Sequence, residues 1–267
     1  MKKLIAFLMA LTLVLSLCAC GETKDSKKTT KSDSDLSYVQ EKGTLVVGIT
    51  DFAPMDYKEK GSDEWVGFDA DMAKAFAKSL GVKAEFVEID WDNKILELNG
   101  KSIDCVWNGM TLTDEVTTAM DCSDAYCNNA QVVVVPTDKA DKYKAADDCK
   151  ELNFAVEKGS AGAAVAKENK FKYTEVKDQA TALMEVAAGT SDAAIIDSLM
   201  AAAMIGKGTS YENLTYTAAL NDEKYGVGFR KGSDLVAKMN DFFKASTEDG
   251  TMQKLAEKYK IQAALIK

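Results

Sequence analysis

Residues 193–205, AAIIDSLMAAAMI, contain the pattern that decides the fold of this chain. Residues 193–197 are a short apolar run that favours a buried strand, and residues 198–205 favour a helix directly after it. Asp197 stands at the junction, where a carboxylate is a preferred cap for the start of a helix. A strand that passes directly into a helix is the repeating unit of α/β folds.

The same alternation continues in both directions along the chain. Strands are expected at residues 44–50, 83–89, 103–107, 131–135, 154–157, 172–176 and 225–230, and helices at 68–80, 93–99, 160–169, 179–188, 198–205, 235–246 and 252–259. The pattern restarts near residue 131, so we predict an α/β fold with parallel strands, arranged as two lobes with a cleft between them. Clefts between lobes are preferred sites for small ligands.

The N-terminal segment differs from the rest of the chain. Lys2 and Lys3 precede an apolar run over residues 4–17, which is short for a membrane span and typical of a secretory signal. Residues 17–20, LCAC, resemble a bacterial lipobox, which implies cleavage after residue 19 and a lipid on Cys20; a plain signal peptide cut nearby is the alternative. We expect a signal at 1–19, a lipidated, flexible tether at 20–42 and a folded part held at the extracellular face of the membrane.

The composition excludes several classes of function. Thirty-three Lys and Arg against 42 Asp and Glu give a net charge of −9, too acidic to offer the basic footprint that nucleic acid requires. There is no histidine, which removes His-based triads and the usual zinc motifs, so no metal or cofactor is expected. Cysteines 105, 122, 127 and 149 are left as either two disulfides or buried thiols, the thiols being favoured.

Four motifs in the folded part resemble those of the bacterial extracellular solute-binding proteins of family 3, the polar amino-acid type. They are GTLVVG with FAPM at 43–55, GFDADMA at 67–73, GMTLTDE at 109–115 and YGVGFRKG at 225–232. The likeness covers residues 43–260 and implies a two-lobe, type II periplasmic-binding-protein-like fold with two crossover strands. It places lobe 1 at 43–133 plus 225–267, lobe 2 at 134–224, and hinges near 132–136 and 222–226. It also implies hinge closure on a solute and delivery to an ABC permease and its ATPase subunit.

The resemblance also implies which residues contact the solute. Asp197 would bind an α-ammonium, the carbonyl of Gly109 and the hydroxyl of Thr111 would touch the head group, and the ring of Phe52 would pack on the side chain. Helix capping by Asp197 and core packing of Phe52 are the alternatives. Weaker candidates are Asp51, Tyr57, Asn108 and Lys158.

Ser160 and Ala161 are candidates from their position alone. They open a helix after Gly159, and N–H groups at a helix start lack partners and lie at its positive end, which suits a carboxylate. A plain helix start is the alternative.

One position departs from the family pattern. Where amino-acid binders usually carry an arginine that grips the α-carboxylate, this chain has Val116. The solute therefore lacks an α-carboxylate, or its carboxylate rests on the Ser160 helix start, Thr111 and Lys158. A tethered sensor and a dehydratase-like or lytic enzyme on the same fold are the competing functions, but Asp51, Glu115 and Asp197 form no recognisable acid–base pair, so no enzyme is expected.

Overall fold

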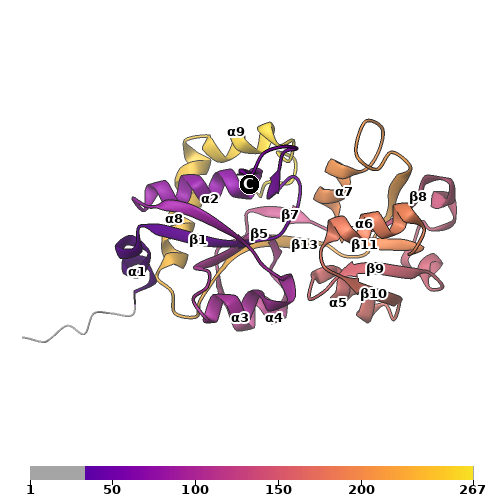
Figure 1. Ribbon diagram of the computed structural model, residues 1–267, viewed down its shortest axis with the longest axis horizontal. Coiled ribbons are helices and arrows are strands. Elements are labelled where there is room, and N and C mark those ends of the chain that lie inside the picture. Colours follow the sequence, from indigo (N-terminus) through magenta and orange to yellow (C-terminus); the bar gives the residue numbers. More distant parts are fainter. Residues whose placement is uncertain (1–33, 267) are drawn as a thin grey trace, which may run out of the picture. The chain divides into compact units, whose positions relative to one another are not determined.

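The computed structural model describes residues 34–266, which form two large β-sheets, each with helices on both faces, and a small two-stranded sheet (Figure 1). The predictions for the signal, for lipidation of Cys20 and for most of the tether therefore lie outside the described residues. Within residues 34–266, no helix has the length and apolar character needed to cross a membrane.

The first sheet has the strand order β4-β1-β5-β13-β6, with β7 paired to β13. Strands β4, β1 and β5 run parallel, as the α/β prediction implies, whereas β13 returns antiparallel to β5. Its strands are β1 (Thr44–Ile49), β4 (Lys83–Glu88), β5 (Cys105–Thr111), β6 (Asp121–Cys122), β7 (Cys127–Asn129) and β13 (Glu223–Phe229).

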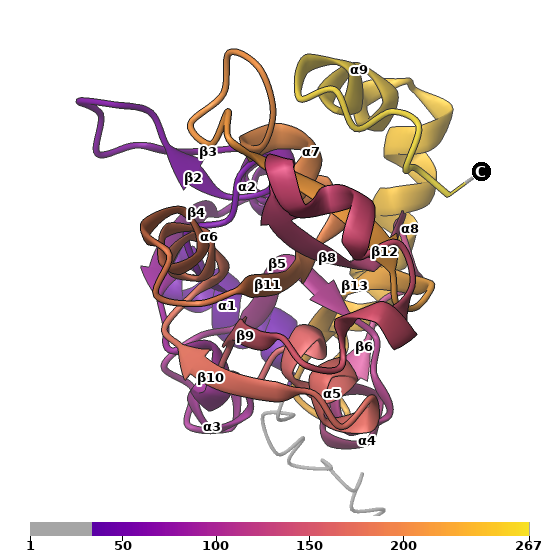
Figure 2. The same cartoon turned by 90° about the vertical axis from the view of Figure 1, so that its right-hand side faces the viewer.

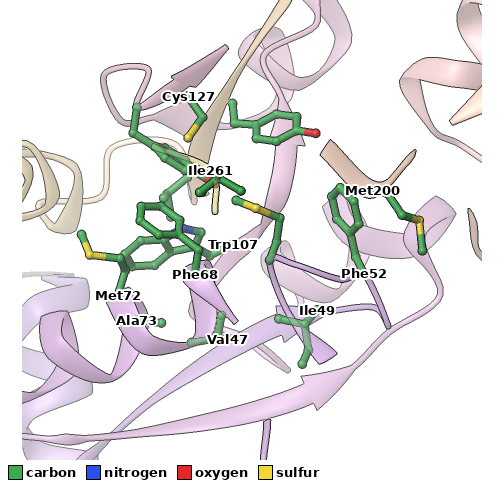
Figure 3. Packing of buried hydrophobic residues seen from close by; sticks show 14 of the residues in the cluster. Val47, Ile49, Phe52, Phe68, Met72, Ala73, Trp107, Cys127, Met200 and Ile261 are labelled. Atoms are coloured by element: carbon green, nitrogen blue, oxygen red, sulfur yellow. The ribbon is translucent and has the colours of Figure 1, made fainter. Parts of the chain in front are cut away.

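Helices cover both faces of the first sheet. Apolar side chains of α2 (Phe68–Ser79), α8 (Leu235–Glu248) and α9 (Thr251–Lys258) pack with those of β1 in one cluster, part of which appears in Figure 3. On the other face, α3 (Lys94–Asn99) and α4 (Asp114–Ala119) pack against β5. The amphipathic pattern that predicted the 68–80 helix is thus explained by burial of one helix face.

The second sheet has the order β10-β9-β11-β8-β12. Strands β9, β10 and β11 are parallel, and β8 and β12 are antiparallel to their neighbours. Helices α6 and α7 lie on one face and α5 on the other (Figures 1 and 2). The elements are β8 (Gln131–Pro136), β9 (Asn153–Glu157), α5 (Ala161–Glu168), β10 (Lys172–Val176), α6 (Gln179–Ala188), β11 (Ala193–Asp197), α7 (Ser198–Met204) and β12 (Leu214–Ala219).

The chain crosses between the sheets twice. It leaves the first sheet at Ala130, between β7 and β8, and returns through residues 220–222, between β12 and β13. The first crossing lies before the predicted hinge at 132–136, because β8 already pairs with β11 at Gln131. Gln131 and the two residues after it therefore belong to the second sheet.

The folded part begins earlier than predicted. Helix α1 (Asp35–Lys42) occupies the end of the range expected to be a flexible tether. Ser34 caps its first turn, Val39 is fully buried, and the Asp35 carboxylate accepts hydrogen bonds of 3.1 Å from Nε of Arg230. The tether prediction is wrong for these residues because a partner 195 positions away holds the helix on the body of the protein.

Several short elements escaped prediction. They include the 3₁₀ turns η1 (Trp91–Asn93), η2 (Thr137–Lys142) and η3 (Ala146–Cys149), and the hairpin of β2 (Tyr57–Lys58) and β3 (Trp65–Val66). Their two- to six-residue lengths leave no periodicity to recognise. The four cysteines of the described part are free thiols, in agreement with the favoured alternative.

Candidate functional site

A cavity of about 650 Å³ opens where the carboxyl ends of β5, β9 and β11 meet the returning crossing segment. In α/β proteins this edge of the strands is where ligands bind. The first-rank candidates all line it, namely Phe52, Gly109, Thr111, Ser160, Ala161 and Asp197.

Of the four weaker candidates, one lines the cavity and three lie outside it. Asn108 lines the cavity, but its amide is engaged with Thr50, donating to Oγ1 at 2.8 Å and accepting from the backbone N at 2.9 Å. Asp51, Tyr57 and Lys158 do not line it. Tyr57 instead meets the ring of Tyr259, and Lys158 forms a 2.9 Å ion pair with Asp92.

Asp197 ends β11 as a buried carboxylate surrounded by hydrogen-bond donors. Its Oδ1 accepts from Tyr225 Oη at 2.7 Å, from Gln131 Nε2 at 3.1 Å and from Asn129 Nδ2. Its Oδ2 accepts from Gln179 Nε2, leaving capacity for a further donor. The side chain does not cap α7, so the capping alternative is wrong at this position.

A second carboxylate, Glu223, is tied to the same donors. Its Oε1 accepts from Thr111 Oγ1 at 2.9 Å, from Gln131 Nε2 at 2.8 Å and from Asn129 Nδ2 at 2.5 Å. Burial, and next the charge of Glu223, raise the pKa of Asp197 well above its usual range. The pair is thus electrostatically costly until positive charge arrives.

A third acid, Glu157, lies at the end of β9 and is also buried against the cavity. Burial is the main cause that raises its pKa to about 8, with the charge of Asp197 adding to it. Nearby Lys94 is buried as well, and burial lowers its pKa. Its Nζ donates to the carbonyl oxygens of Gly159 at 2.8 Å and Trp91 at 3.2 Å.

Gly109 and Thr111 lie inside β5, which extends beyond the strand predicted at residues 103–107. Gly109 has φ of +56°, and a Cβ there would stand 2.4 Å from Cε1 of Phe52. Its N–H donates to Asp69 Oδ2 at 2.6 Å, and burial raises the pKa of Asp69 to about 7. Glycine is therefore required for the strand to approach the Phe52 ring.

Phe52 belongs both to the cavity wall and to the apolar core. Its ring meets Tyr225 edge-on, with 6.4 Å between centroids, and Figure 3 shows it near Met200. Only 3% of the residue is exposed, so the core-packing alternative and the cavity position both hold.

Ser160 and Val116 form two other parts of the wall. Oγ of Ser160 accepts from Ala163 N at 3.1 Å and caps α5, so the plain helix start predicted as the alternative is present. This cap leaves the N–H groups of Ala161 and Gly162 as the unpaired donors of the first turn. Val116 lines the cavity as a buried apolar side chain of α4.

Sequence reasoning missed the residues that give the site its charge. The residues that were not recognised are Glu157, Gln179, Glu223 and Lys94. Of these, Glu157 carries a signal in the sequence, because it is an acid that ends an apolar strand two residues before Gly159. Lys94 and Gln179 look like ordinary helix residues, and only tertiary packing buries them. Among residues 34–266, no three acidic or thiol groups are grouped to hold a metal ion.

Comparison with known proteins agrees with this architecture. Residues 45–262 match the family described as bacterial extracellular solute-binding proteins, family 3. The arginine-binding extracellular protein of Bacillus subtilis is 29% identical over 97% of this chain and 98% of its own length.

Solved structures give the same result. An ancestral amino acid-binding protein, described as a precursor of cyclohexadienyl dehydratase, is 36% identical with a TM-score of 0.77, covering 85% of this chain and 99% of the other. A histidine-bound substrate-binding protein of an ABC uptake transporter from Streptococcus pneumoniae is 26% identical with a TM-score of 0.80, covering 88% and 100%. The chain belongs to the bacterial extracellular solute-binding proteins of family 3.

Proposed function

We propose that this chain is the extracellular solute-binding component of an ABC importer, and that it captures a small solute bearing an ammonium group, an amino acid or a close analogue. The observation that carries the proposal is Asp197, a buried carboxylate that lines the cavity and whose Oδ2 accepts one protein donor. A bound ammonium would supply both the missing donor and the compensating charge.

The rest of the wall suits the other parts of such a solute. Ser160 and Ala161 line the cavity at the start of α5, and the N–H groups at this positive helix end offer a place for a carboxylate. They would take the place of the carboxylate-binding arginine that the family usually carries at the position of Val116. The ring of Phe52 offers an apolar or cation-binding face.

Closure would bring the two halves together by rotation at the crossing segments. Two ion pairs join the elements of the first sheet to those of the second: Lys177 with Glu88 at 2.7 Å, and Lys158 with Asp92 at 2.9 Å. They would favour the closed form weakly, because all four side chains are about half exposed.

The solute test has two parts. Native mass spectrometry of the protein as purified should detect a bound amine. After incubation with the protein, that amine should be recovered with its mass unchanged, as expected of a solute of a binding protein rather than a substrate of an enzyme. Asp197→Asn should lower the affinity for that solute at least tenfold, while Asp192→Asn, an acid on the loop before β11, should not. Equal binding by both variants would contradict the assignment of Asp197.

We also propose that Cys20 carries the lipid that holds the protein at the extracellular face of the membrane. Metabolic labelling with an alkyne fatty acid should mark the wild-type protein and a Cys18→Ala variant equally. Cys20→Ala should lose the label and appear in the medium. Labelled Cys20→Ala would contradict the proposal.

A further inference from the structure

Glu157 has a buried oxygen that nothing in the described protein satisfies. The residue is 3% exposed, its side chain lines the cavity, and Oε1 has no hydrogen-bond partner among residues 34–266. A buried polar atom without a partner is costly and requires an explanation.

The neighbouring polar groups do not remove this cost. The amide of Gln179 is shared with Asp197, to which it donates through Nε2 and from whose backbone N it accepts at 2.9 Å. The ammonium of Lys94 makes its hydrogen bonds to two backbone carbonyls rather than to Glu157. Glu157 is therefore a buried acid without a direct ion-pair partner.

Glu157 is also separate from the other anionic part of the cavity. Asp197 and Glu223 are joined through the side chains of Asn129 and Gln131, which donate to both. Glu157 takes part in none of those bonds and stands at the end of β9, the strand parallel to β11. The cavity therefore has two acidic centres, one at Asp197 with Glu223 and one at Glu157.

We infer that the solute carries two positive charges, an ammonium bound at Asp197 and a second cationic group bound at Glu157, which makes Glu157 the residue that selects cationic over neutral solutes. The inference rests on the proposed function and narrows it. Val116, which lines the cavity where the family usually carries an arginine, adds no positive charge that would oppose such a solute.

The surroundings of Glu157 predict a proton release on binding. Burial and the charges of Asp197 and Asp178 raise its pKa to about 8, and the hydrogen bond from Gln179 and the charge of Lys94 only partly oppose them. The unliganded carboxyl is therefore mostly protonated at pH 7. A cation beside it favours the carboxylate, so the proton leaves to the buffer as the solute binds.

Calorimetry with three small molecules tests the inference on the whole protein. L-arginine and L-citrulline have nearly the same shape but differ in one positive charge, and agmatine keeps both charges without the carboxylate. We expect arginine or agmatine to bind at least tenfold more tightly than citrulline at pH 7. Their binding enthalpy should differ between phosphate and Tris buffers by the amount that release of about one proton requires.

Two variants complete the test. Glu157→Gln should lose most of the preference for the dication, whereas Glu151→Gln, an exposed acid of the same half outside the cavity, should keep it. If Glu157→Gln fails to fold, as judged by circular dichroism, the preference of the wild type for arginine and agmatine over citrulline still decides, because proton release alone does not distinguish Glu157 from Asp197, whose pKa is also raised. A wild type that binds dications without releasing a proton would overturn the inference.

The outcomes separate this inference from the function on which it rests. Binding of citrulline or another neutral amino acid as tight as that of arginine would overturn the dication and leave the proposed function standing. A dication preference unchanged in Glu157→Gln would overturn the role of Glu157. Failure to bind any amino acid or amine would overturn the proposed function, and the inference with it.

Discussion

Two acidic residues of the cavity wall, Asp197 and Glu157, differ in how much of their role the sequence reveals. Asp197 could be found from the sequence because a carboxylate at a strand end is a familiar pattern, and the family resemblance gave it a role. Glu157 also stands at a strand end, but nothing in the neighbouring sequence shows that its side chain is buried. Its burial depends on the pairing of β9 with β11 and on α6, which no local pattern reveals.

The raised pKa of Glu157 has a consequence for stability. The unfolded chain loses this proton near the ordinary value of 4.5, and the folded protein loses it near 8. Between these values the folded state holds more protons, so its stability falls as the pH rises through this window. Glu157→Gln removes this loss, and we expect the unliganded variant to gain stability relative to wild type from pH 5 to pH 9, on the order of 4 kcal/mol at 1.36 kcal/mol per pKa unit.

Urea denaturation of both proteins at pH 5, 7 and 9 checks the expectation. Glu151→Gln serves as the control, since its carboxylate is exposed. A constant difference between wild type and Glu157→Gln across the three pH values would show that the buried carboxyl titrates normally.

Gly109 gives a prediction of a steric kind. Gly109→Ala would place a methyl group 2.4 Å from the Phe52 ring at a φ of +56°. We expect a loss of roughly 1–3 kcal/mol in the free energy of unfolding and weaker solute binding, because the strand and the ring must move apart. Gly81→Ala, also at positive φ but with open space around the Cβ position, should lose stability without losing affinity.

At the scale of whole helices and strands, some elements could be predicted from sequence patterns, whereas others depend on tertiary contacts. The long helices and most of the central strands lie at or near their predicted ranges, because burial imposes a period on the sequence, whereas β12 and α4 were not predicted. Helix α1 was missed because its residues are mostly polar, and its stability comes from Val39 and from Arg230 on a distant strand end. The antiparallel direction of β13 was also missed, because direction depends on connections rather than on composition.

Helix α1 can be tested by truncation. A chain that starts at residue 43 should be less stable than one that starts at residue 34 by roughly 2–4 kcal/mol in the free energy of unfolding. The loss follows from exposing the contacts of Val39 and leaving Arg230 without Asp35. Guanidinium unfolding curves of the two chains give the difference, and equal midpoints would show that α1 contributes nothing.

At the scale of the whole molecule, the two halves meet through exposed ion pairs as well as through the cavity. Glu88→Lys places two like charges at the position of the 2.7 Å pair with Lys177. We expect it to lower the affinity for the co-purified solute about two- to fivefold, the size typical of an exposed pair, and less at high salt. The exchanged double variant Glu88→Lys with Lys177→Glu should restore the affinity; no recovery would mean that the pair plays no part in closure.

The returning crossing segment is bound to Gln131, the first residue of the second sheet, and Gln131 is also bound to the site. The N–H of Gln131 donates to Asn221 Oδ1 at 2.7 Å, and the N–H of Leu220 donates to the Gln131 carbonyl at 2.8 Å. The side chain of the same Gln131 holds Asp197. One glutamine thus connects the carboxylate proposed to bind the solute with the segment through which the chain returns, so a shift of that carboxylate would be passed through Gln131 to Leu220 and Asn221.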